Sequence, residues 1–318
     1  MNEILNKVSN NELLSKDDIV KLLNTDNFSS EFYLLLSKAN EMSRIQYKNK
    51  GYIFAQIGIN AKPCTGNCKF CSLAKDNYTI GSEFEKSLDE VVAQVASIEL
   101  NKLDSLFLMT TADFSFKKFI KIGEAVKKII PTHVHLIANI GDFDDEMAKA
   151  LVKTGFSGVY HIVRLREGID TGIPKETRIQ TLNAAKQNGL DILYCVEPIG
   201  SEHTYDEIAD EIIRARDYNV EVMAIMGRTS VKGTPFENSE ELTEIELTKI
   251  AAVTRIAVNP KKSMNIHEPK RMPLLAGINQ FYAEIGINPR DTVKDTENSR
   301  GKSINEVEKM LNSANYYV

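Results

Sequence analysis

The chain has 318 residues, of which 42% are hydrophobic and 26% are charged, a composition typical of a globular protein with a substantial core. This composition excludes an intrinsically disordered chain, a collagen and a coiled coil. Asp and Glu outnumber Lys and Arg by 44 to 39, which gives a formal net charge of -5. Because there is no surplus of basic residues, neither nucleic acid nor an anionic membrane is an expected partner, and a small-molecule substrate is favoured.

The N-terminus has no basic start, apolar run and small-residue cleavage site in succession, so no signal peptide is predicted. No stretch contains the ~18 uninterrupted apolar residues of a transmembrane helix. We therefore expect a cytoplasmic protein without a membrane segment.

Three helical segments are predicted in the first 48 residues. The first contains Leu5 and Val8, the second begins near Asp17, and the third runs from Ser29 to about Tyr47 with apolar residues at helical spacing. No repeat, low-complexity tract or linker divides the remainder. The predicted organisation is therefore a helical cap at residues 1–48 and one barrel domain with a helical tail at residues 49–318.

Short apolar runs rich in β-branched or aromatic residues follow, and they alternate with amphipathic helical patterns. The runs occupy residues 52–60, 105–111, 134–140, 158–165, 190–198, 220–227, 263–267 and 279–285. Eight such units predict a parallel (β/α)8 TIM barrel, complete or nearly so, and a doubly wound open sheet is the alternative. The chemistry of a barrel lies at the C-terminal ends of its strands. Residues 288–292 and a helical tail at 303–317 are expected to close the bottom or pack on the side.

Three of the four cysteines, Cys64, Cys68 and Cys71, lie within eight residues directly after the first predicted strand. In a reducing compartment, such a group is more typical of metal binding or catalysis than of disulfides. Thiolates with this spacing can bind one corner of a [4Fe-4S] cluster and would leave one iron open to another ligand. Two alternatives stay open: a zinc site completed by Cys195 or a histidine, and an electron carrier, although a ferredoxin would supply a fourth cysteine.

The segment from Cys64 to Cys71 has the form Cys-x3-Cys-x2-Cys, with the aromatic Phe70 before the last cysteine, and it resembles the radical S-adenosylmethionine (SAM) enzymes. The resemblance implies that the three cysteines hold a [4Fe-4S] cluster, whose open iron is chelated by the amino and carboxylate groups of SAM. It also implies that the reduced cluster cleaves SAM and yields a 5'-deoxyadenosyl radical, which abstracts a hydrogen atom from the substrate.

Over about residues 30–300 the chain resembles the biotin synthase-like group, which includes biotin synthase, methylornithine synthase and hydrogenase-cofactor maturases. The landmarks are residues 177–204, 232–235 and 274–282. Arg178 matches the arginine that pairs with the SAM carboxylate in this group, a task suited to a bidentate guanidinium. By position, the resemblance implies SAM contacts for Phe70, Thr110, Thr111, Arg164, Arg166, Glu167 and Arg178.

The chain also departs from its group. Biotin synthase holds a second, sulfur-donating cluster with three further cysteines and an arginine, and only Cys195 lies at one of these places. We therefore expect a single-cluster enzyme, with a divergent sulfur-inserting biotin or lipoyl synthase-like enzyme as the alternative. Cys195, His267 and Glu284 lie on predicted strands and are the candidate catalytic residues.

The expected function is that of a radical SAM enzyme, which abstracts hydrogen from a small polar metabolite in cofactor or amino-acid biosynthesis. Rearrangement or fragmentation of the substrate would follow. A flavodoxin or ferredoxin is the expected electron donor. A non-catalytic metal-binding or electron-transfer protein is the alternative from another class.

Overall fold

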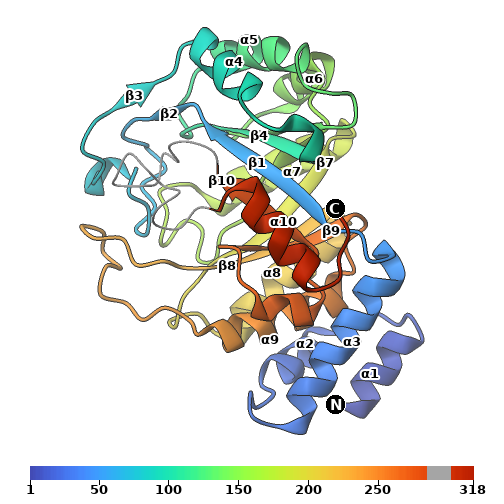
Figure 1. Cartoon of the computed structure of the whole chain (residues 1–318). Coiled ribbons are helices and arrows are strands. Elements are labelled where there is room, and N and C mark those ends of the chain that lie inside the picture. The colour runs from blue at the N-terminus through green and yellow to red at the C-terminus, as the bar shows by residue number, and fades with distance from the viewer. Residues whose placement is uncertain (285–301) are drawn as a thin grey trace.

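The structure is a computed structural model that describes residues 1–284 and 302–318. Within these residues, parallel strands close into a barrel in the order β1-β10-β9-β8-β7-β6-β5-β4 (Figure 1). The strands are β1 (Tyr52–Gly58), β4 (Ser105–Met109), β5 (His135–Asn139), β6 (Gly158–Tyr160), β7 (Asp191–Ile199), β8 (Val222–Gly227), β9 (Ser263–His267) and β10 (Gln280–Glu284). The barrel closes because β1 pairs with both β4 and β10. The predicted (β/α)8 barrel is confirmed, and the open sheet is excluded.

The barrel helices are α4 (Leu88–Ala96), α5 (Phe116–Lys127), α6 (Asp145–Thr154), α7 (Lys175–Gln187), α8 (Tyr205–Tyr218), α9 (Glu244–Val258) and α10 (Ile304–Ser313). After β9 a short 3-10 segment, η3 (Met272–Ala276), takes the place of an α-helix. Capping boxes at Ser87, Thr204 and Ser303 satisfy backbone N–H groups where α4, α8 and α10 begin. Gly155, at φ 99°, ends α6 in the left-handed conformation.

Two features depart from the expected pattern of strands. After β1, two short strands, β2 (Asn60–Ala61) and β3 (Phe84–Glu85), pair antiparallel. The 3-10 segment η1 (Lys75–Asn77) lies in the chain between them. A second 3-10 segment, η2 (Leu100–Lys102), precedes β4. The predicted run at 158–165 is a strand only to Tyr160. Beyond it, the N–H of Val163 donates to the hydroxyl of Tyr194 at 3.2 Å instead of to a neighbouring strand.

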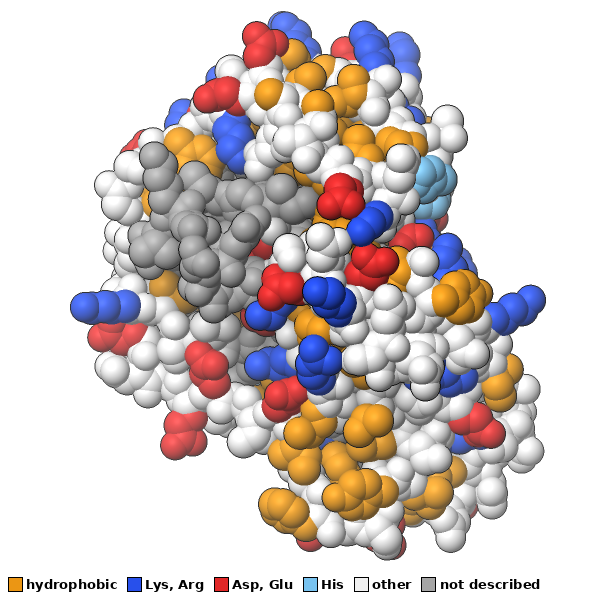
Figure 2. Space-filling model, in the orientation of Figure 1, with side chains coloured by type: hydrophobic (Ala, Val, Ile, Leu, Met, Phe, Trp, Pro, Cys, Tyr) orange, Lys and Arg blue, Asp and Glu red, His pale blue; other side chains and the backbone are white. Residues whose placement is uncertain are grey.

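Three N-terminal helices, α1 (Asn2–Ser9), α2 (Lys16–Leu23) and α3 (Ser30–Tyr47), lie at one end of the molecule (Figure 1). Helices α2 and α3 pack against α8, α9 and η3. Figure 2 shows apolar side chains gathered over this end, whereas charges of both signs are interspersed over the rest of the same face. The exposed apolar residues of these helices and their connections are Leu13, Phe28, Tyr33, Leu34 and Ile45. The division of the chain at residue 48 stays a prediction.

Side chains fill the interior of the barrel below its C-terminal opening. A core cluster separate from the main core contains Phe54, Phe107, Ile137, Leu193, Val222 and Tyr282, from six different strands. Because side chains alternate along a strand, the inward residue two positions further on, such as Gln56 after Phe54, lies nearer the C-terminal opening. The filled interior therefore confines any large cavity to that opening.

Helix α10 packs against β1 and β10, and Tyr317 forms a bridge with Lys50 just before β1. The tail thus lies on the side of the barrel, as expected, while residues 288–292 lie outside the described residues. None of the described helices is both long and apolar enough to cross a membrane.

Candidate active site

The cysteine loop follows β1 and β2 at the C-terminal end of the barrel, and hydrogen bonds hold it in shape. The N–H of Cys64 donates to the carbonyl of Leu73 at 2.7 Å, and that of Lys75 donates to the carbonyl of Cys64 at 3.0 Å. The next βα loop also holds it, because the N–H of Thr65 donates to a carboxylate oxygen of Asp113 at 2.9 Å. The backbone around Cys64 is therefore held in place by bonds within the chain.

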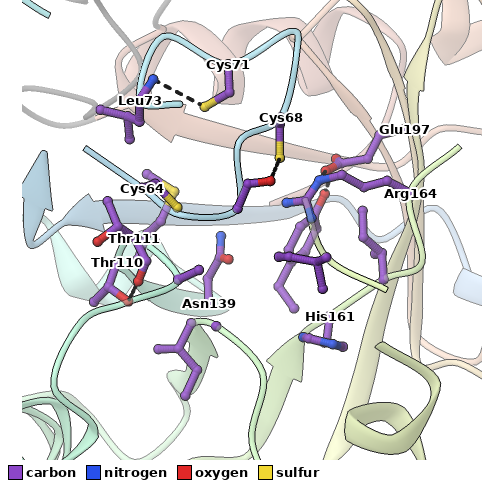
Figure 3. A pocket seen from close by; sticks show the side chains of 18 of the residues that line it. Cys64, Cys68, Cys71, Leu73, Thr110, Thr111, Asn139, His161, Arg164 and Glu197 are labelled. Atoms are coloured by element: carbon purple, nitrogen blue, oxygen red, sulfur yellow. Dashed lines mark hydrogen bonds and ion pairs between the residues drawn. The ribbon is translucent and has the colours of Figure 1, made fainter. Parts of the chain in front are cut away.

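All three cysteines line a cavity that opens to solvent at the centre of the barrel opening (Figure 3). Its polar residues come from strands and loops far apart in the sequence, which the barrel brings together. They are Gln56, Thr110, Thr111, Asn139, Tyr160, His161, Arg164, Arg178, Glu197 and His267.

The cysteine loop fits a polynuclear cluster. A Cβ atom on Gly66 would lie 3.4 Å from Sγ of Cys64 and 3.9 Å from Sγ of Cys68, so the glycine leaves space beside the sulfurs. Among the described residues, no three His, Cys, Asp or Glu side chains are placed to hold a single metal ion. Each thiolate of a polynuclear cluster binds a different iron, so the three sulfurs need not converge on one ion as the ligands of a zinc site must. The donor set thus fits a [4Fe-4S] cluster better than a zinc ion.

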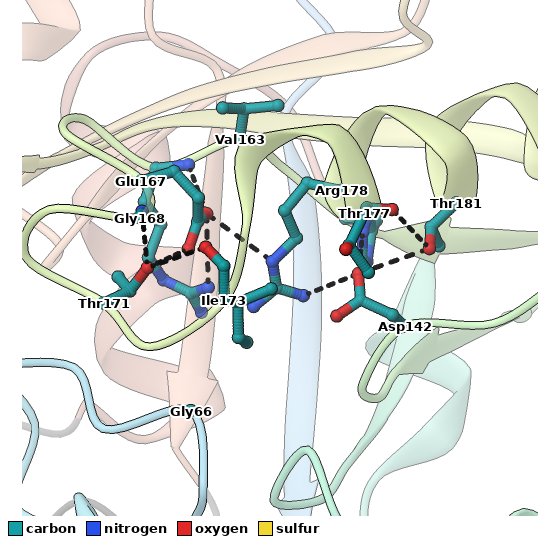
Figure 4. A network of polar contacts seen from close by, with 12 residues as sticks. Gly66, Asp142, Val163, Glu167, Gly168, Thr171, Ile173, Thr177, Arg178 and Thr181 are labelled. Atoms are coloured by element: carbon teal, nitrogen blue, oxygen red, sulfur yellow. Dashed lines mark hydrogen bonds and ion pairs between the residues drawn. The ribbon is translucent and has the colours of Figure 1, made fainter.

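Arg178, near the start of α7, lies in a network of buried charges at the cavity wall (Figure 4). Its Nη1 is 3.3 Å from Oδ1 of Asp142, and its Nε is 3.5 Å from Oε2 of Glu167. Nε makes no hydrogen bond although the side chain is only 6% exposed. Two carboxylates therefore orient the guanidinium at the cavity wall.

The charged residues after β6 point in different directions. Arg164 lines the cavity. Arg166, at φ 54°, turns outward and pairs with Glu207, with 2.8 Å between Nε and Oε1. Glu167 is buried behind Arg178, and its carboxylate accepts a hydrogen bond from the backbone N–H of Arg164 at 2.8 Å. Arg164, Arg166 and Glu167 were all expected to contact SAM, and of these three only Arg164 lies in the cavity wall.

Thr110 and Thr111 lie in the cavity wall on the loop after β4. The hydroxyl of Thr111 accepts a hydrogen bond from the amide of Asn60 at 2.8 Å, and the same amide accepts the N–H of Thr111 at 3.0 Å. The hydroxyl of Thr110 donates to the carbonyl of Thr111 at 2.9 Å. Asn60 thus orients this loop, a role that sequence reasoning missed because its partner is 51 residues away.

His161 lies in the cavity wall beside Asp142 and Arg178. Its Nε2 is 3.3 Å from Oδ1 of Asp142 but makes no hydrogen bond there. Burial lowers the pKa of His161 to about 4, and Arg178 acts in the same direction against the opposing effect of Asp142. The imidazole is therefore neutral at physiological pH, and the cations on this wall are the arginines.

Tyr160, Glu197 and His267 line the part of the cavity below the cysteine loop, which we call its floor. The hydroxyl of Tyr160 donates to Oε2 of Glu197 at 2.6 Å. Cys195 is fully buried on the same strand as Glu197. Its burial, and to a smaller extent the nearby charge of Glu197, raise the pKa of its thiol well above the usual value. His267 lines the cavity from β9, with its Nε2 3.1 Å from the amide nitrogen of Asn265. Two of the candidate catalytic residues are thus close to the floor, His267 in its lining and Cys195 beneath it.

Glu284, the third candidate, is buried at the end of β10 opposite Gln56 and does not line the cavity. Below the opening, the interior positions hold aromatic and aliphatic side chains together with the amides of Asn265 and Gln280. All four cysteines of the chain lie in described segments, and Cys195 is the only one on a barrel strand. The described interior therefore offers one thiol where a second, sulfur-donating cluster would need several.

A second cavity adjoins the first, and the lining residues that the two share are Cys68, Cys71, Arg164, Glu197 and Met226. Phe70 lines this second cavity, as do Arg228 and Glu268, which follow β8 and β9. Arg228 is 4% exposed, forms an ion pair with Glu202, and leaves its Nη2 without a hydrogen bond. The expected site residues that line a cavity are therefore distributed over two adjoining spaces around the cysteine loop.

Three comparisons relate the chain to known proteins. The profile described as the Radical SAM superfamily matches residues 62–245, more than half of the chain. A biotin synthase from Clostridioides difficile is 27% identical over 268 residues, which cover 80% of this chain and 81% of that protein.

Among solved structures, a methylornithine synthase superposes with a TM-score of 0.85 at 16% identity, over 99% of this chain and 96% of that one. An FeFe-hydrogenase maturase from Carboxydothermus hydrogenoformans superposes with a TM-score of 0.82 at 17% identity, over 99% of this chain and 78% of that one. At these identities the two structures establish a shared fold.

Proposed function

This chain belongs to the radical SAM superfamily, and we propose that it uses one [4Fe-4S] cluster to abstract hydrogen from a small polar metabolite. It is an enzyme of the branch that contains biotin synthase, and proteins of this superfamily use a [4Fe-4S] cluster and SAM. When bound, the reduced cluster supplies the electron that cleaves SAM to a 5'-deoxyadenosyl radical. The observation that carries the proposal is that Cys64, Cys68 and Cys71 line the same cavity as a polar floor built from several strands.

The residues around the cysteine loop have different roles in this proposal. Cys64, Cys68 and Cys71 would bind three irons. Arg178, which lines the cavity, would bind the carboxylate of SAM, and Arg164 would contribute a second cation to the same wall. The carbonyls and hydroxyls of Thr110 and Thr111 would accept hydrogen bonds from the SAM amino group.

The floor residues would hold the substrate below the cysteine loop. Exclusion of water from the occupied cavity would protect a radical from side reactions. Rearrangement, fragmentation or a change in carbon–carbon bonding would follow hydrogen abstraction. A flavodoxin or ferredoxin would deliver the electron, because SAM cleavage needs a strongly reducing donor.

Sulfur insertion is the less favoured alternative within the superfamily. It would need a second cluster or another sulfur donor inside the barrel. Apart from Cys195, the described interior around Tyr160 and Phe107 presents rings, aliphatic side chains and two amides rather than thiols.

The test is anaerobic reconstitution with iron and sulfide, followed by addition of dithionite and SAM. About four irons per chain together with release of 5'-deoxyadenosine would support the proposal. Six to eight irons, on the order of two clusters, would revive sulfur insertion. Tightly bound zinc without SAM cleavage would refute the assignment.

A further inference from the structure

Beyond the end of β6, the chain keeps the register of a parallel ladder with β7 at two points. The N–H of His161 donates to the carbonyl of Leu193 at 3.3 Å, and the N–H of Leu165 donates to the carbonyl of Glu197 at 2.9 Å. In a regular parallel ladder, the N–H groups that face the neighbouring strand come from every second residue. One further bond is therefore expected midway between these two.

The bond in the middle is not made between two backbones. By register, it would run from the N–H of Val163 to the carbonyl of Cys195. Instead, the N–H of Val163 donates to the hydroxyl of Tyr194 at 3.2 Å. A side-chain oxygen of β7 thus takes the place of a backbone oxygen, and the ladder is interrupted at Val163.

The hydroxyl of Tyr194 is itself held from outside the barrel. Tyr194 is fully buried, and its hydroxyl donates to Oε2 of Glu211 on α8 at 2.6 Å. Nε of Arg214, three residues further along α8, donates to the same oxygen at 2.9 Å. Burial, and then the charge of Glu211, raises the pKa of Tyr194 well above the usual value, so the hydroxyl keeps its proton. Because that proton is donated to Glu211, the hydroxyl oxygen is the acceptor for the N–H of Val163.

The interruption coincides with a change in which side chains face the cavity. In a regular strand only every second side chain would do so, yet Tyr160, His161, Ile162 and Arg164 all line the cavity. The N–H of Arg164 donates to the carboxylate of Glu167 at 2.8 Å. The backbone N–H of Arg164 and those of the residues on either side are thus all hydrogen-bonded, which fixes where its side chain begins.

We propose that Tyr194 is a positioning residue for SAM binding, because its hydroxyl holds Val163 where the side chain of Arg164 is directed into the cavity. Without that hydroxyl, the buried N–H of Val163 would lose its acceptor, which is unfavourable, and the segment would move. Tyr194 is not among the described residues that line the two cavities, so it would act on SAM through Arg164. The inference rests on the proposed function, because it assumes that Arg164 belongs to the SAM site.

The test compares SAM affinity, by equilibrium dialysis, in anaerobically reconstituted holoenzymes whose iron content is counted. Tyr194→Phe removes only the hydroxyl and is expected to weaken SAM binding by roughly tenfold while about four irons per chain are retained. Tyr47→Phe is the matched control. Tyr47 is also buried, and its hydroxyl donates to the carbonyl of Pro260, before β9 at the N-terminal end of the barrel strands. This control is expected to bind SAM within about twofold of the wild type.

A double-mutant cycle separates positioning from a general loss of stability. In the Arg164→Ala background, adding Tyr194→Phe is expected to change SAM affinity by less than about twofold, because the side chain that Tyr194 positions is already gone. Hydrogen exchange of residues 161–166 in the wild-type holoenzyme needs no variant to fold. These amides are expected to be protected before SAM is added, since their acceptors belong to the protein.

The inference is overturned if Tyr194→Phe binds SAM as tightly as the wild type, or if Tyr47→Phe weakens binding to the same extent. An equal loss in the Arg164→Ala background would also overturn it, as would fast exchange of residues 161–166 until SAM is bound. A wild-type holoenzyme that binds and cleaves SAM, combined with any of these results, would refute this inference alone. A wild-type holoenzyme that binds no SAM would refute the proposed function.

Discussion

Buried His161 makes a prediction about how stability depends on pH. Its pKa is about 4 in the folded chain, because burial disfavours the charged imidazole, and about 6.5 when the chain is unfolded. Below pH 6.5 the unfolded chain therefore binds a proton that the folded chain does not. The stabilisation from neutral His161 is complete above about pH 6.5 and is lost as the pH falls toward 4. Between pH 7 and pH 5 the loss amounts to about 2 kcal/mol.

The measurement is urea unfolding of the apo chain at pH 7 and pH 5, for wild type and His161→Asn. Far-ultraviolet circular dichroism is the suitable signal, because the chain has no tryptophan. His135 and His203 also have lowered pKa values through burial, but they are present in both proteins and cancel in the comparison. Wild type is expected to lose about 2 kcal/mol more than the variant. Equal losses in the two proteins would show that His161 is not kept neutral by its surroundings.

Three further predictions concern the cavity wall. Cys68→Ala removes one cluster ligand, so iron after reconstitution should fall from about four per chain to near zero; a variant that still carries a SAM-cleaving cluster would contradict the assignment. Arg178→Ala should keep the cluster but weaken SAM binding by roughly tenfold or more. It should also lower the free energy of unfolding by about 3 kcal/mol, because Asp142 loses a buried partner. Unchanged SAM affinity in equilibrium dialysis would refute a role of Arg178 in SAM binding. Gly141→Ala puts a Cβ atom 2.3 Å from the carbonyl oxygen of Ala112, so the loop after β4 must shift, at a cost of about 1–3 kcal/mol in unfolding free energy; wild-type stability and SAM affinity would count against this packing.

The architecture was predictable because it depends on local pattern. Apolar runs alternate with amphipathic segments along the chain, and strands and helices have different periods, so their order can be read without tertiary information. The eight expected runs correspond to the barrel strands. The β2–β3 hairpin was missed because each of its strands has only two residues, too few to show a period.

The directions of individual side chains were less predictable, above all where strands end. Arg164, Arg166 and Glu167 are close neighbours in the sequence, yet only Arg164 reaches the cavity. The backbone leaves the sheet after Tyr160, so the alternation of a strand no longer applies there. Arg166 adopts a left-handed conformation that nothing in its identity foretells.

The sequence by itself determined the order of strands and helices and the spacing of Cys64, Cys68 and Cys71, because both are properties of short segments. Only the tertiary structure decided which charges face one another. The pairing of Arg178 with Asp142 joins residues 36 positions apart, and the contact between Tyr282 and Glu268 depends on two neighbouring strands. Such contacts arise when the barrel closes and brings its C-terminal strand ends together. They determine which neighbour balances each buried charge, and this cannot be read from short segments of the sequence.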